Sequence, residues 1–405
     1  MNILFITAEG FDTPNPNNQM AETMMREFTD RRHSVYLIQS HRKGINPDIP
    51  KNLINKRGFK VATIKRKTID KTNFIGRYIA DSFYAFQAMK IWKKIKNVDV
   101  IYLQSNPTVI FSILLLKLFK HHVPIVYSIY DVFPGHARDI GVINNALLFE
   151  LLRLTQKICY KLSDAIIVQS DDMKKKVLEQ GAKERKIFIV EPWYDVKTTK
   201  EIPWNENRFV KKYNIKQDKF HVQFAGSISY VFNYFSILEL AERLFKDEDI
   251  EIQIIGDGSA KEKFIKEAEN RGLKNIRFFP LQPVEMVPDV YSECDVCVIP
   301  LKKGVIGNGV PSKAGILMTC KRVIVSSVEK SSEYAKIFSK YNMGIAVEIK
   351  DYDGFADAIR WLKHNPDRRQ QMVENAYQYS IDHYSSNVGI SNMLNVFKIA
   401  AKRRI

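Results

Sequence analysis

The sequence predicts an α/β fold made of two doubly wound domains, in which helices cover both faces of a parallel sheet. Three observations carry this prediction. The chain has 405 residues, more than one hydrophobic core ordinarily holds. Short β-branched apolar segments alternate with amphipathic stretches, which is typical of parallel sheets with right-handed crossovers. A polar stretch, residues 191–216, contains Pro192 and Pro203 and separates two series of such segments.

The first series predicts six strands, because each segment is short, apolar and followed by turn residues or a helical stretch. They are residues 2–8, 34–38, 98–103, 123–129, 165–168 and 186–190. Amphipathic periodicity predicts helices between them at 19–31, 80–95 and 144–162. This series defines a first domain, residues 1–195.

The second series predicts five strands and a sixth at 344–348. The five are residues 220–225, 250–255, 276–279, 295–299 and 322–326. An amphipathic helix at 259–271 connects the second to the third. This series defines a second domain, residues 196–380, and leaves residues 381–405 as a separate C-terminal helical segment.

Composition excludes several classes of protein. Four cysteines in a chain of this length form no disulfide framework and indicate a reducing compartment. The segment 1–6 lacks the basic residues that open a secretory signal, and it indicates a strand. The longest other apolar run ends at Lys117, far short of the roughly 20 residues that a spanning helix needs. We therefore expect a cytoplasmic protein.

The net charge of +17 is unevenly distributed, since residues 51–100 contain 13 Lys or Arg against 3 Asp or Glu. Aromatic side chains such as Phe59, Phe74 and Tyr78 lie among these basic residues. This mixture favours an anionic membrane surface, contacted through residues 51–96, although a solvated basic surface explains the same counts. No recognisable nucleic-acid-binding module is present, so we expect no nucleic-acid partner.

Ligands of open parallel sheets bind beyond the carboxyl ends of the strands, so the residues there are candidates for a site. After the first strand, the amide-rich loop 10–19 contains Gly10, Asn18 and Gln19, which suit hydrogen bonding to sugar hydroxyls, although a plain surface loop is equally consistent. It lacks the G-x-G-x-x-G pattern of a dinucleotide site. After the fourth strand, Asp131, His136 and Arg138 place an acid, an imidazole and a guanidinium within eight residues, which favours a polar site, although a turn capped by Asp131 with His136 and Arg138 in solvent is the alternative.

Glycine-bearing turns follow the strands of the second domain. Gly226 and Ser227 end one strand, and Gly256, Asp257 and Gly258 end the next. Glycine permits the backbone to approach a ligand closely, so both turns are compatible with a nucleotide.

The strongest motif is the loop that contains Gly307, Asn308 and Gly309 and leads through Ser312 and Lys313 into a helix at 314–320. A helix N-terminus presents free backbone N–H groups and a positive dipole end. With the hydroxyl of Ser312 and the ammonium of Lys313, it predicts a diphosphate site. An N-cap by Ser312 explains the helix but leaves the glycines of the loop unexplained.

No zinc site is expected, because Cys294 and Cys297 form a single C-x-x-C pair within a strand-like segment. We expect neither a metal nor another cofactor.

In this order, the motifs resemble the retaining glycosyltransferases of family 4, over nearly the whole chain. The segments that carry the resemblance are 105–107, 130–134, 169–170, 181–182, 190–195, 256–259, 279–283 and 311–313. The second domain is similar to the branch of capsule and O-antigen biosynthesis that includes L-fucosamine transferases. The resemblance implies the GT-B fold, two facing Rossmann-like domains with a C-terminal helix that packs back on the first.

The resemblance also implies roles. The family transfers a sugar from a nucleotide-diphosphate donor, here expected to be a UDP-sugar, to an acceptor, here expected to be a lipid-linked saccharide. The implied donor residues are Gly226, Ser227, Gly256, Asp257, Gly258, Leu281, Asn308, Gly309, Ser312 and Lys313. The implied acceptor residues are Gly10, Asn18, Gln19, Asp131 and Arg138. Asp131, His136 and Lys313 would act in catalysis, at the inner face of the plasma membrane.

The chain departs from the family pattern at several positions. The paired glutamates of the family align with Asn308 and Ile316, the lysine after the Gly226 turn aligns with Phe232, and the glutamate after the Asp131 motif aligns with Gly135. These departures favour, as an alternative, a non-catalytic partner subunit of the same fold. A sugar-nucleotide epimerase is a second alternative, since it shares the fold and needs no acceptor.

Overall fold

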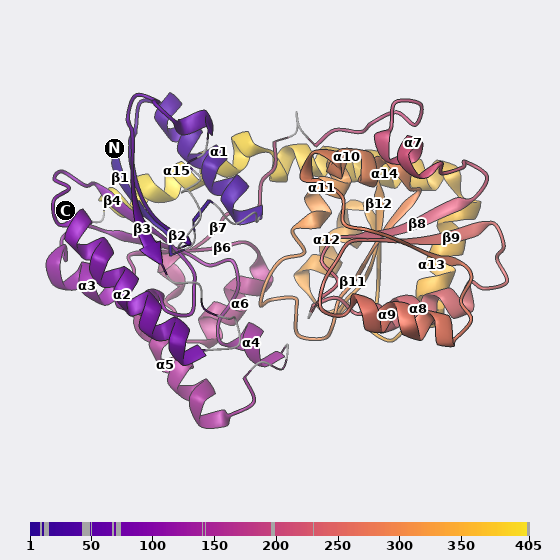
Figure 1. Ribbon diagram of the computed structural model, residues 1–405, viewed down its shortest axis with the longest axis horizontal. Coiled ribbons are helices and arrows are strands. Elements are labelled where there is room, and N and C mark those ends of the chain that lie inside the picture. The colour runs from indigo at the N-terminus through magenta and orange to yellow at the C-terminus, as the bar shows by residue number, and fades with distance from the viewer. Residues whose placement is uncertain are drawn as a thin grey trace. The chain divides into compact units, whose positions relative to one another are not determined.

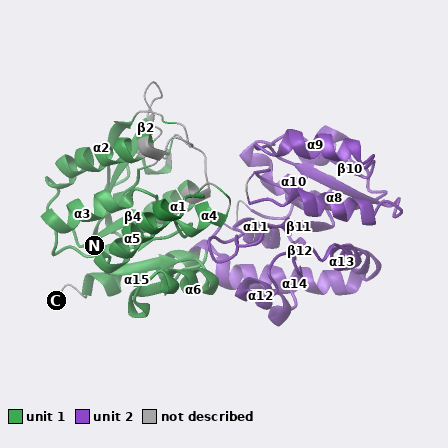
Figure 2. Cartoon of the chain, turned by 90° about the horizontal axis from the view of Figure 1, so that it is seen from below, with its two compact units in different colours: residues 1–191, 387–405 green, residues 192–386 purple. Residues whose placement is uncertain are grey.

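The computed structural model describes residues 1–8, 10–11, 16–42, 49, 51–66, 69, 74–139, 141, 143–195, 199–229 and 231–402. They form two compact units, each with its own sheet (Figures 1 and 2). Unit 1 is residues 1–191 and 387–405, and unit 2 is residues 192–386. The predicted domains end at 195 and 380, whereas the units divide after 191 and 386; the second difference arises because the last helix of unit 2 continues to Tyr384.

Unit 1 contains a parallel sheet of seven strands. They are β1 (Asn2–Ile6), β2 (Ser34–Arg42), β3 (Phe59–Arg66), β4 (Val100–Gln104), β5 (Ile125–Ser128), β6 (Ala165–Val168) and β7 (Ile187–Ile189). Their order is β3-β2-β1-β4-β5-β6-β7. The central strand β1 pairs with β2 and β4, and its residues from Ile3 to Ile6 are buried, which explains the unbroken apolar run. All six predicted strands are present, and β3 is a seventh that the sequence analysis does not predict.

Six helices and a returning helix cover this sheet. They are α1 (Pro16–Asp30), α2 (Phe74–Trp92), α3 (Val109–Phe119), α4 (Gly135–Asp139), α5 (Ala146–Leu162), α6 (Asp171–Glu179) and α15 (Ser386–Lys402). The ring of Phe397 on α15 contacts Phe28 of α1 and Tyr102 of β4, with centroids 5.4 and 5.6 Å apart. Among the described residues, no helix is long and apolar enough to cross a membrane.

Strand β3 changes the interpretation of the basic stretch 51–96. Arg66, its last residue, forms an ion pair with Asp81 of α2 and donates to the Ala8 carbonyl oxygen at 2.8 Å. Lys56 Nζ lies 2.6 Å from Asp30 Oδ1. Part of the positive charge in this stretch is therefore neutralised within unit 1. Lys67, Lys71 and the side chains of Lys51, Phe74, Ile75 and Arg77 lie outside the described residues.

Unit 2 contains a parallel sheet of six strands in the order β10-β9-β8-β11-β12-β13. They are β8 (Phe220–Ala225), β9 (Ile250–Ile255), β10 (Ile276–Phe279), β11 (Val296–Pro300), β12 (Val323–Ser327) and β13 (Gly344–Val347). The helices are α7 (Arg208–Tyr213), α8 (Tyr234–Arg243), α9 (Lys261–Asn270), α10 (Val287–Glu293), α11 (Lys313–Thr319), α12 (Glu333–Tyr341), α13 (Tyr352–His364) and α14 (Pro366–Tyr384). All six predicted strands of this unit are present.

Two further observations concern the core and the chain path. Cys294 and Cys297 are buried and unbridged, with their Sγ atoms 3.3 Å apart. The chain passes between the units twice, and the two passages pair with each other. Tyr194 N–H donates to the Tyr384 carbonyl oxygen at 2.8 Å, and Ser386 N–H donates to the Tyr194 carbonyl oxygen at 3.0 Å.

Candidate functional site

The candidate site of unit 2 lies at the carboxyl ends of β8 and β9, where two glycine turns press against each other. A Cβ on Gly256 would stand 1.9 Å from the Gly226 carbonyl oxygen, and one on Gly258 would stand 2.3 Å from the Ile228 carbonyl oxygen. The φ angles of Gly256 and Gly258, +148° and +154°, also disfavour any side chain. The sequence analysis assigns these two glycines to a nucleotide site, and the structure shows in addition that both pack against backbone from the loop after β8.

Lys313 is the central cation of this site. It is the first residue of α11, and its Nζ donates to the Ala225 carbonyl oxygen at 3.1 Å, at the end of β8. The same Nζ lies 3.8 Å from the centre of the Phe224 ring. A Cβ on Gly226 would approach Nζ to 2.7 Å, so a glycine there leaves room for the ammonium. Three successive residues of one strand end therefore surround the Lys313 head group.

The electrostatics of Lys313 point to a missing anion. Among the residues that the structure describes, no carboxylate forms an ion pair with its ammonium, whose neighbours include the Ala225 carbonyl oxygen, the Phe224 ring and the thiol of Cys297. Burial lowers the pKa of Lys313 from 10.5 to about 7. A buried ammonium without a counter-ion is unfavourable, so an anionic ligand placed against Nζ would be bound strongly.

The loop before α11 folds back on itself through Gly304. The Asn308 side chain donates from Nδ2 to the Gly304 carbonyl oxygen at 2.8 Å, and the Gly304 N–H donates to Glu329 Oε1 at 2.6 Å. Asn308, expected at the donor, thus also shapes its own loop. Glu329 follows β12, and its Oε2 is buried without a hydrogen-bond partner among the described residues. The sequence analysis missed Glu329, although its place after a predicted strand was a usable signal.

Ser312 precedes α11, and its side chain makes no capping hydrogen bond, so the structure does not support the alternative in which Ser312 serves as the N-cap. Its carbonyl oxygen instead accepts from the hydroxyl of Tyr194. The Tyr194 ring also fills the space beside Gly315, where a Cβ would stand 2.2 Å from Cε2. Tyr194 therefore supports the start of α11 from the segment that enters unit 2, a role the sequence analysis does not predict.

The remaining predicted donor residues lie on the surface of unit 2. Ser227 and Asp257 are exposed, and Ser227 Oγ donates to Ser229 Oγ at 2.9 Å. Leu281, predicted beside a nucleotide base, follows β10 and is 64% exposed. Lys261, which the sequence analysis missed, bridges two strand ends, because its Nζ donates to the carbonyl oxygens of Gly256 and Phe279 at 2.7 and 3.3 Å.

In unit 1, the residues after β5 only partly form the predicted polar group. Solvent reaches Asp131, yet the protein around its carboxyl raises its pKa through desolvation, and the charge of His136 acts in the opposite direction. His136 lies on α4, and its buried Nδ1 has no hydrogen-bond partner among the described residues. The guanidinium of Arg138 instead stacks on the Phe149 ring of α5 at 4.4 Å, so Arg138 is occupied by packing.

The predicted loop after β1 is described at both of its ends. Asn18 Nδ2 donates to the Gly10 carbonyl oxygen at 3.1 Å and closes the loop. Residues 12–15 and the side chain of Gln19 lie outside the described residues. Near the same strand end, buried Asp81 binds both Arg66 and the hydroxyl of Thr108. Sequence reasoning counted Arg66 only as surface charge and so missed this cluster.

Two family models match the chain. The model described as glycosyl transferases group 1 matches residues 205–379, and the model described as glycosyltransferase family 4 matches residues 18–198. The family 4 match covers most of unit 1 after β1, and the group 1 match covers the whole sheet of unit 2.

Relatives and solved structures agree with these matches. The chain is 26% identical over 279 residues to WbjE of Pseudomonas aeruginosa, described as a probable glycosyltransferase, which covers 68% of this chain and 69% of that one. It is 22% identical over 319 residues to WcaI of Escherichia coli K12, provisionally described as a colanic acid biosynthesis glycosyl transferase, covering 75% of each chain. The crystal structure of HepE of Anabaena in complex with UDP superposes with a TM-score of 0.74 at 12% identity, covering 98% of this chain and 100% of that one.

Proposed function

Because the chain belongs to the group 1 and family 4 glycosyltransferases, enzymes of the GT-B fold, we propose that it moves a sugar from a UDP-sugar to a lipid-linked saccharide, with retention of anomeric configuration. The pathway would be the synthesis of capsule, O-antigen or exopolysaccharide at the inner face of the plasma membrane. The observation that carries the proposal is Lys313, a partly buried ammonium at the end of β8 without a carboxylate partner among the described residues.

The donor diphosphate would supply the anion that Lys313 lacks. As the bond to the sugar breaks, negative charge grows on the leaving phosphate, and the ammonium held at Ala225 stabilises that charge. Other enzymes use a metal ion to stabilise such a charge. In the proposed transfer the ammonium of Lys313 stabilises it, so no metal is needed. The UDP bound by HepE, a protein of the same fold, supports UDP as the nucleotide.

The acceptor would be oriented by unit 1. Asp131, whose pKa is raised, and His136, whose Nδ1 has no protein partner among the described residues, are available to hydrogen-bond an acceptor hydroxyl. No general base is required if the leaving phosphate takes the proton of the acceptor hydroxyl. Loss of these side chains would then lower the rate with acceptor and leave UDP binding intact.

Thermal unfolding in the presence of nucleotides tests the donor assignment. UDP at 100 times its Kd should add about 2.7 kcal/mol to the free energy of unfolding, whereas GDP, ADP and CMP should add less. Lys313→Ala should abolish the UDP effect, and Lys246→Ala, a change of an exposed lysine outside the site, should leave it unchanged. Equal stabilisation by all four nucleotides, or an unchanged UDP effect in Lys313→Ala, would refute the assignment.

A second candidate function is a non-catalytic partner subunit of the same fold. It is favoured by Asn308 and Ile316, which stand where the sequence resemblance places the paired glutamates of the family. Release of UDP from UDP-sugars, with transfer of the sugar to an extract of lipid-linked saccharides, distinguishes the two. UDP binding without any turnover of a donor panel would favour the partner subunit.

A further inference from the structure

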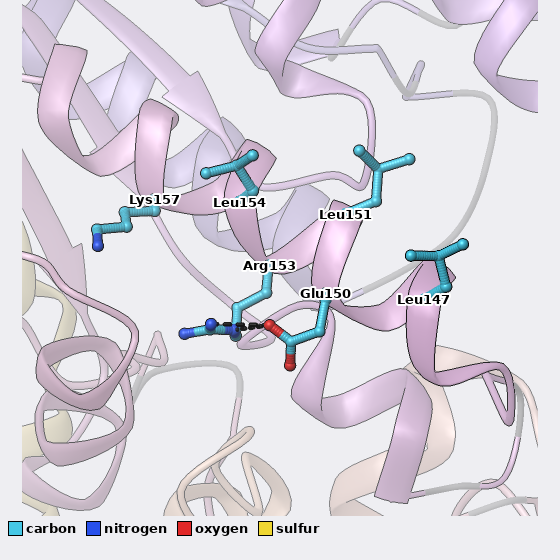
Figure 3. Close-up of a pocket in the computed structure, with 6 residues that line it drawn as sticks. All are labelled: Leu147, Glu150, Leu151, Arg153, Leu154 and Lys157. Atoms are coloured by element: carbon cyan, nitrogen blue, oxygen red, sulfur yellow. Dashed lines mark hydrogen bonds and ion pairs between the residues drawn. The ribbon is translucent and has the colours of Figure 1, made fainter.

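The outer surface of unit 1 exposes large apolar side chains on three helices. On α5, Leu147, Leu151 and Leu154 are 82, 58 and 55% exposed. Their spacing of four and three residues places them in one row along the helix, as Figure 3 shows. Phe83 of α2 and Leu118 of α3 are 66 and 69% exposed. Contiguous apolar surface of this kind is uncommon on a soluble protein unless something binds there.

The three helices form one layer. Each connects a strand of unit 1 to the next in the series β3, β4, β5, β6, and every connection runs in the same direction across the sheet. Right-handed crossovers then place α2, α3 and α5 on one face of the sheet. Helix α2 packs against α3, and α3 against α5 (Figure 1). Their solvent-exposed sides therefore make one continuous surface, which we call the α2–α3–α5 face.

Basic side chains border the apolar rows. Arg153 and Lys157 lie beside the leucines of α5 (Figure 3), and Lys161 continues the row, against one acid, Glu150, which pairs with Arg153 at 2.7 Å. Just after α2, Lys93 Nζ lies 3.3 Å from the centre of the Phe119 ring, at the end of α3. Lysine stems laid along apolar surface, with their ammonium groups at its edge, suit an interface between water and lipid.

We propose that the α2–α3–α5 face docks on an anionic bilayer, with leucine and phenylalanine side chains entering the lipid and the basic residues contacting headgroup phosphates. Apolar insertion combined with basic flanks is the pattern of helices that lie in the membrane surface. A second copy of the chain suits this face less well, because a two-fold contact would place Arg153 and Lys157 near their own counterparts. This proposal rests on the proposed function in one respect: membrane docking would bring unit 1 to a lipid-linked acceptor.

Vesicle co-sedimentation of the full chain tests this surface. The probes are vesicles of phosphatidylcholine alone and of phosphatidylcholine mixed with phosphatidylglycerol. The double variant Leu151→Glu/Leu154→Glu removes the apolar row, and Lys157→Glu/Lys161→Glu reverses charge beside it. Phe245→Glu is the matched control, since Phe245 is an exposed apolar residue of unit 2.

We expect the wild type to bind the anionic vesicles, and Leu151→Glu/Leu154→Glu to lower the partition coefficient by at least about tenfold. Lys157→Glu/Lys161→Glu should lower binding to anionic vesicles, with a loss that shrinks as salt rises. Phe245→Glu should change neither the binding to anionic vesicles nor its dependence on salt. Binding by the leucine variant equal to wild type would overturn the proposal, as would a shift of that variant from dimer to monomer in sedimentation with vesicle binding unchanged.

Thermal shift with UDP on the same variants separates this proposal from the donor assignment. A leucine variant that loses vesicle binding but keeps UDP stabilisation supports the docking surface even if the acceptor is of another kind. A wild type that binds UDP but neither vesicle overturns the docking surface and leaves the donor site standing.

Discussion

Proton uptake on UDP binding is the sharpest consequence of the environment of Lys313. The ammonium of the free protein has a pKa of about 7, against 10.5 in a solvated chain, because burial disfavours the charge. This difference corresponds to about 5 kcal/mol, an upper limit because Lys313 is only partly buried. A diphosphate beside Nζ raises the pKa again, so binding above pH 7 must be accompanied by protonation of Lys313.

The magnitude follows from the pKa. At pH 8, Lys313 is about nine-tenths neutral in the free protein, so UDP binding should take up about 0.9 proton. UDP itself is fully ionised at pH 8, because the second pKa of its terminal phosphate is about 6. Between pH 7 and pH 9 the Kd for UDP should rise about 50-fold, since each bound UDP then requires one added proton.

Isothermal titration calorimetry in buffers of different ionisation enthalpy measures this uptake. Lys313→Arg is the control, because a guanidinium stays protonated at these pH values. UDP binding to this variant should therefore take up no proton at this position, even if some affinity for UDP remains. Uptake near zero in the wild type at pH 8 would refute the reasoning. So would the same uptake in Lys313→Arg, because another group would then be the one that titrates.

The same environment predicts how the stability of the unliganded protein depends on pH. The folded-state pKa of Lys313 is depressed, so the unfolded chain binds more protons between about pH 7 and pH 10.5. The contribution of Lys313 to the free energy of unfolding therefore rises with pH across this window, and Lys313→Met should remove that rise in urea titrations.

Three further predictions concern packing, each measured by urea unfolding. Gly256→Ala should lower the free energy of unfolding by about 2–3 kcal/mol, because its Cβ would stand 1.9 Å from a carbonyl oxygen, whereas Gly272→Ala, with open space around the Cβ, should cost about 1 kcal/mol. Phe397→Ala should cost about 3–5 kcal/mol, since the ring is fully buried against α1 and β4, and Phe397→Leu should cost less than half as much. Tyr194→Phe should cost about 1 kcal/mol by removing the hydrogen bond to the Ser312 carbonyl oxygen, and an unchanged midpoint would contradict that bond.

The sequence predicted both sheets because parallel strands buried on both faces appear as short, mainly apolar segments, and twelve of the thirteen strands were predicted in this way. The exception, β3, lies at the edge of its sheet and has the sequence FKVATIKR, with basic residues near both of its ends. Charged residues are common on edge strands, so its composition resembled that of a surface segment. The exposure of the α5 leucines was also not predicted. Apolar residues on several sides of a helix do not reveal which side is buried.

The site was predicted less completely than the fold. Lys313 was identified from its loop, but its lowered pKa depends on Phe224 and Ala225, about 90 positions earlier in the chain. The glycines after β9 were identified as special, but their close contact with backbone oxygens of the loop after β8 was not predicted. Contacts of this kind arise from which strands become neighbours, and sequence spacing alone does not give that order.

The path of the chain constrains how the protein is made. Unit 2 is a single uninterrupted stretch, residues 192–386, whereas unit 1 needs α15 from the end of the chain to cover Phe28 and Tyr102. On the ribosome, the first unit to be translated is therefore the last to be completed. Its apolar surface stays exposed to solvent until residue 402 has left the ribosome. A stop codon just after α14 would yield a finished unit 2 tethered to an unfinished unit 1.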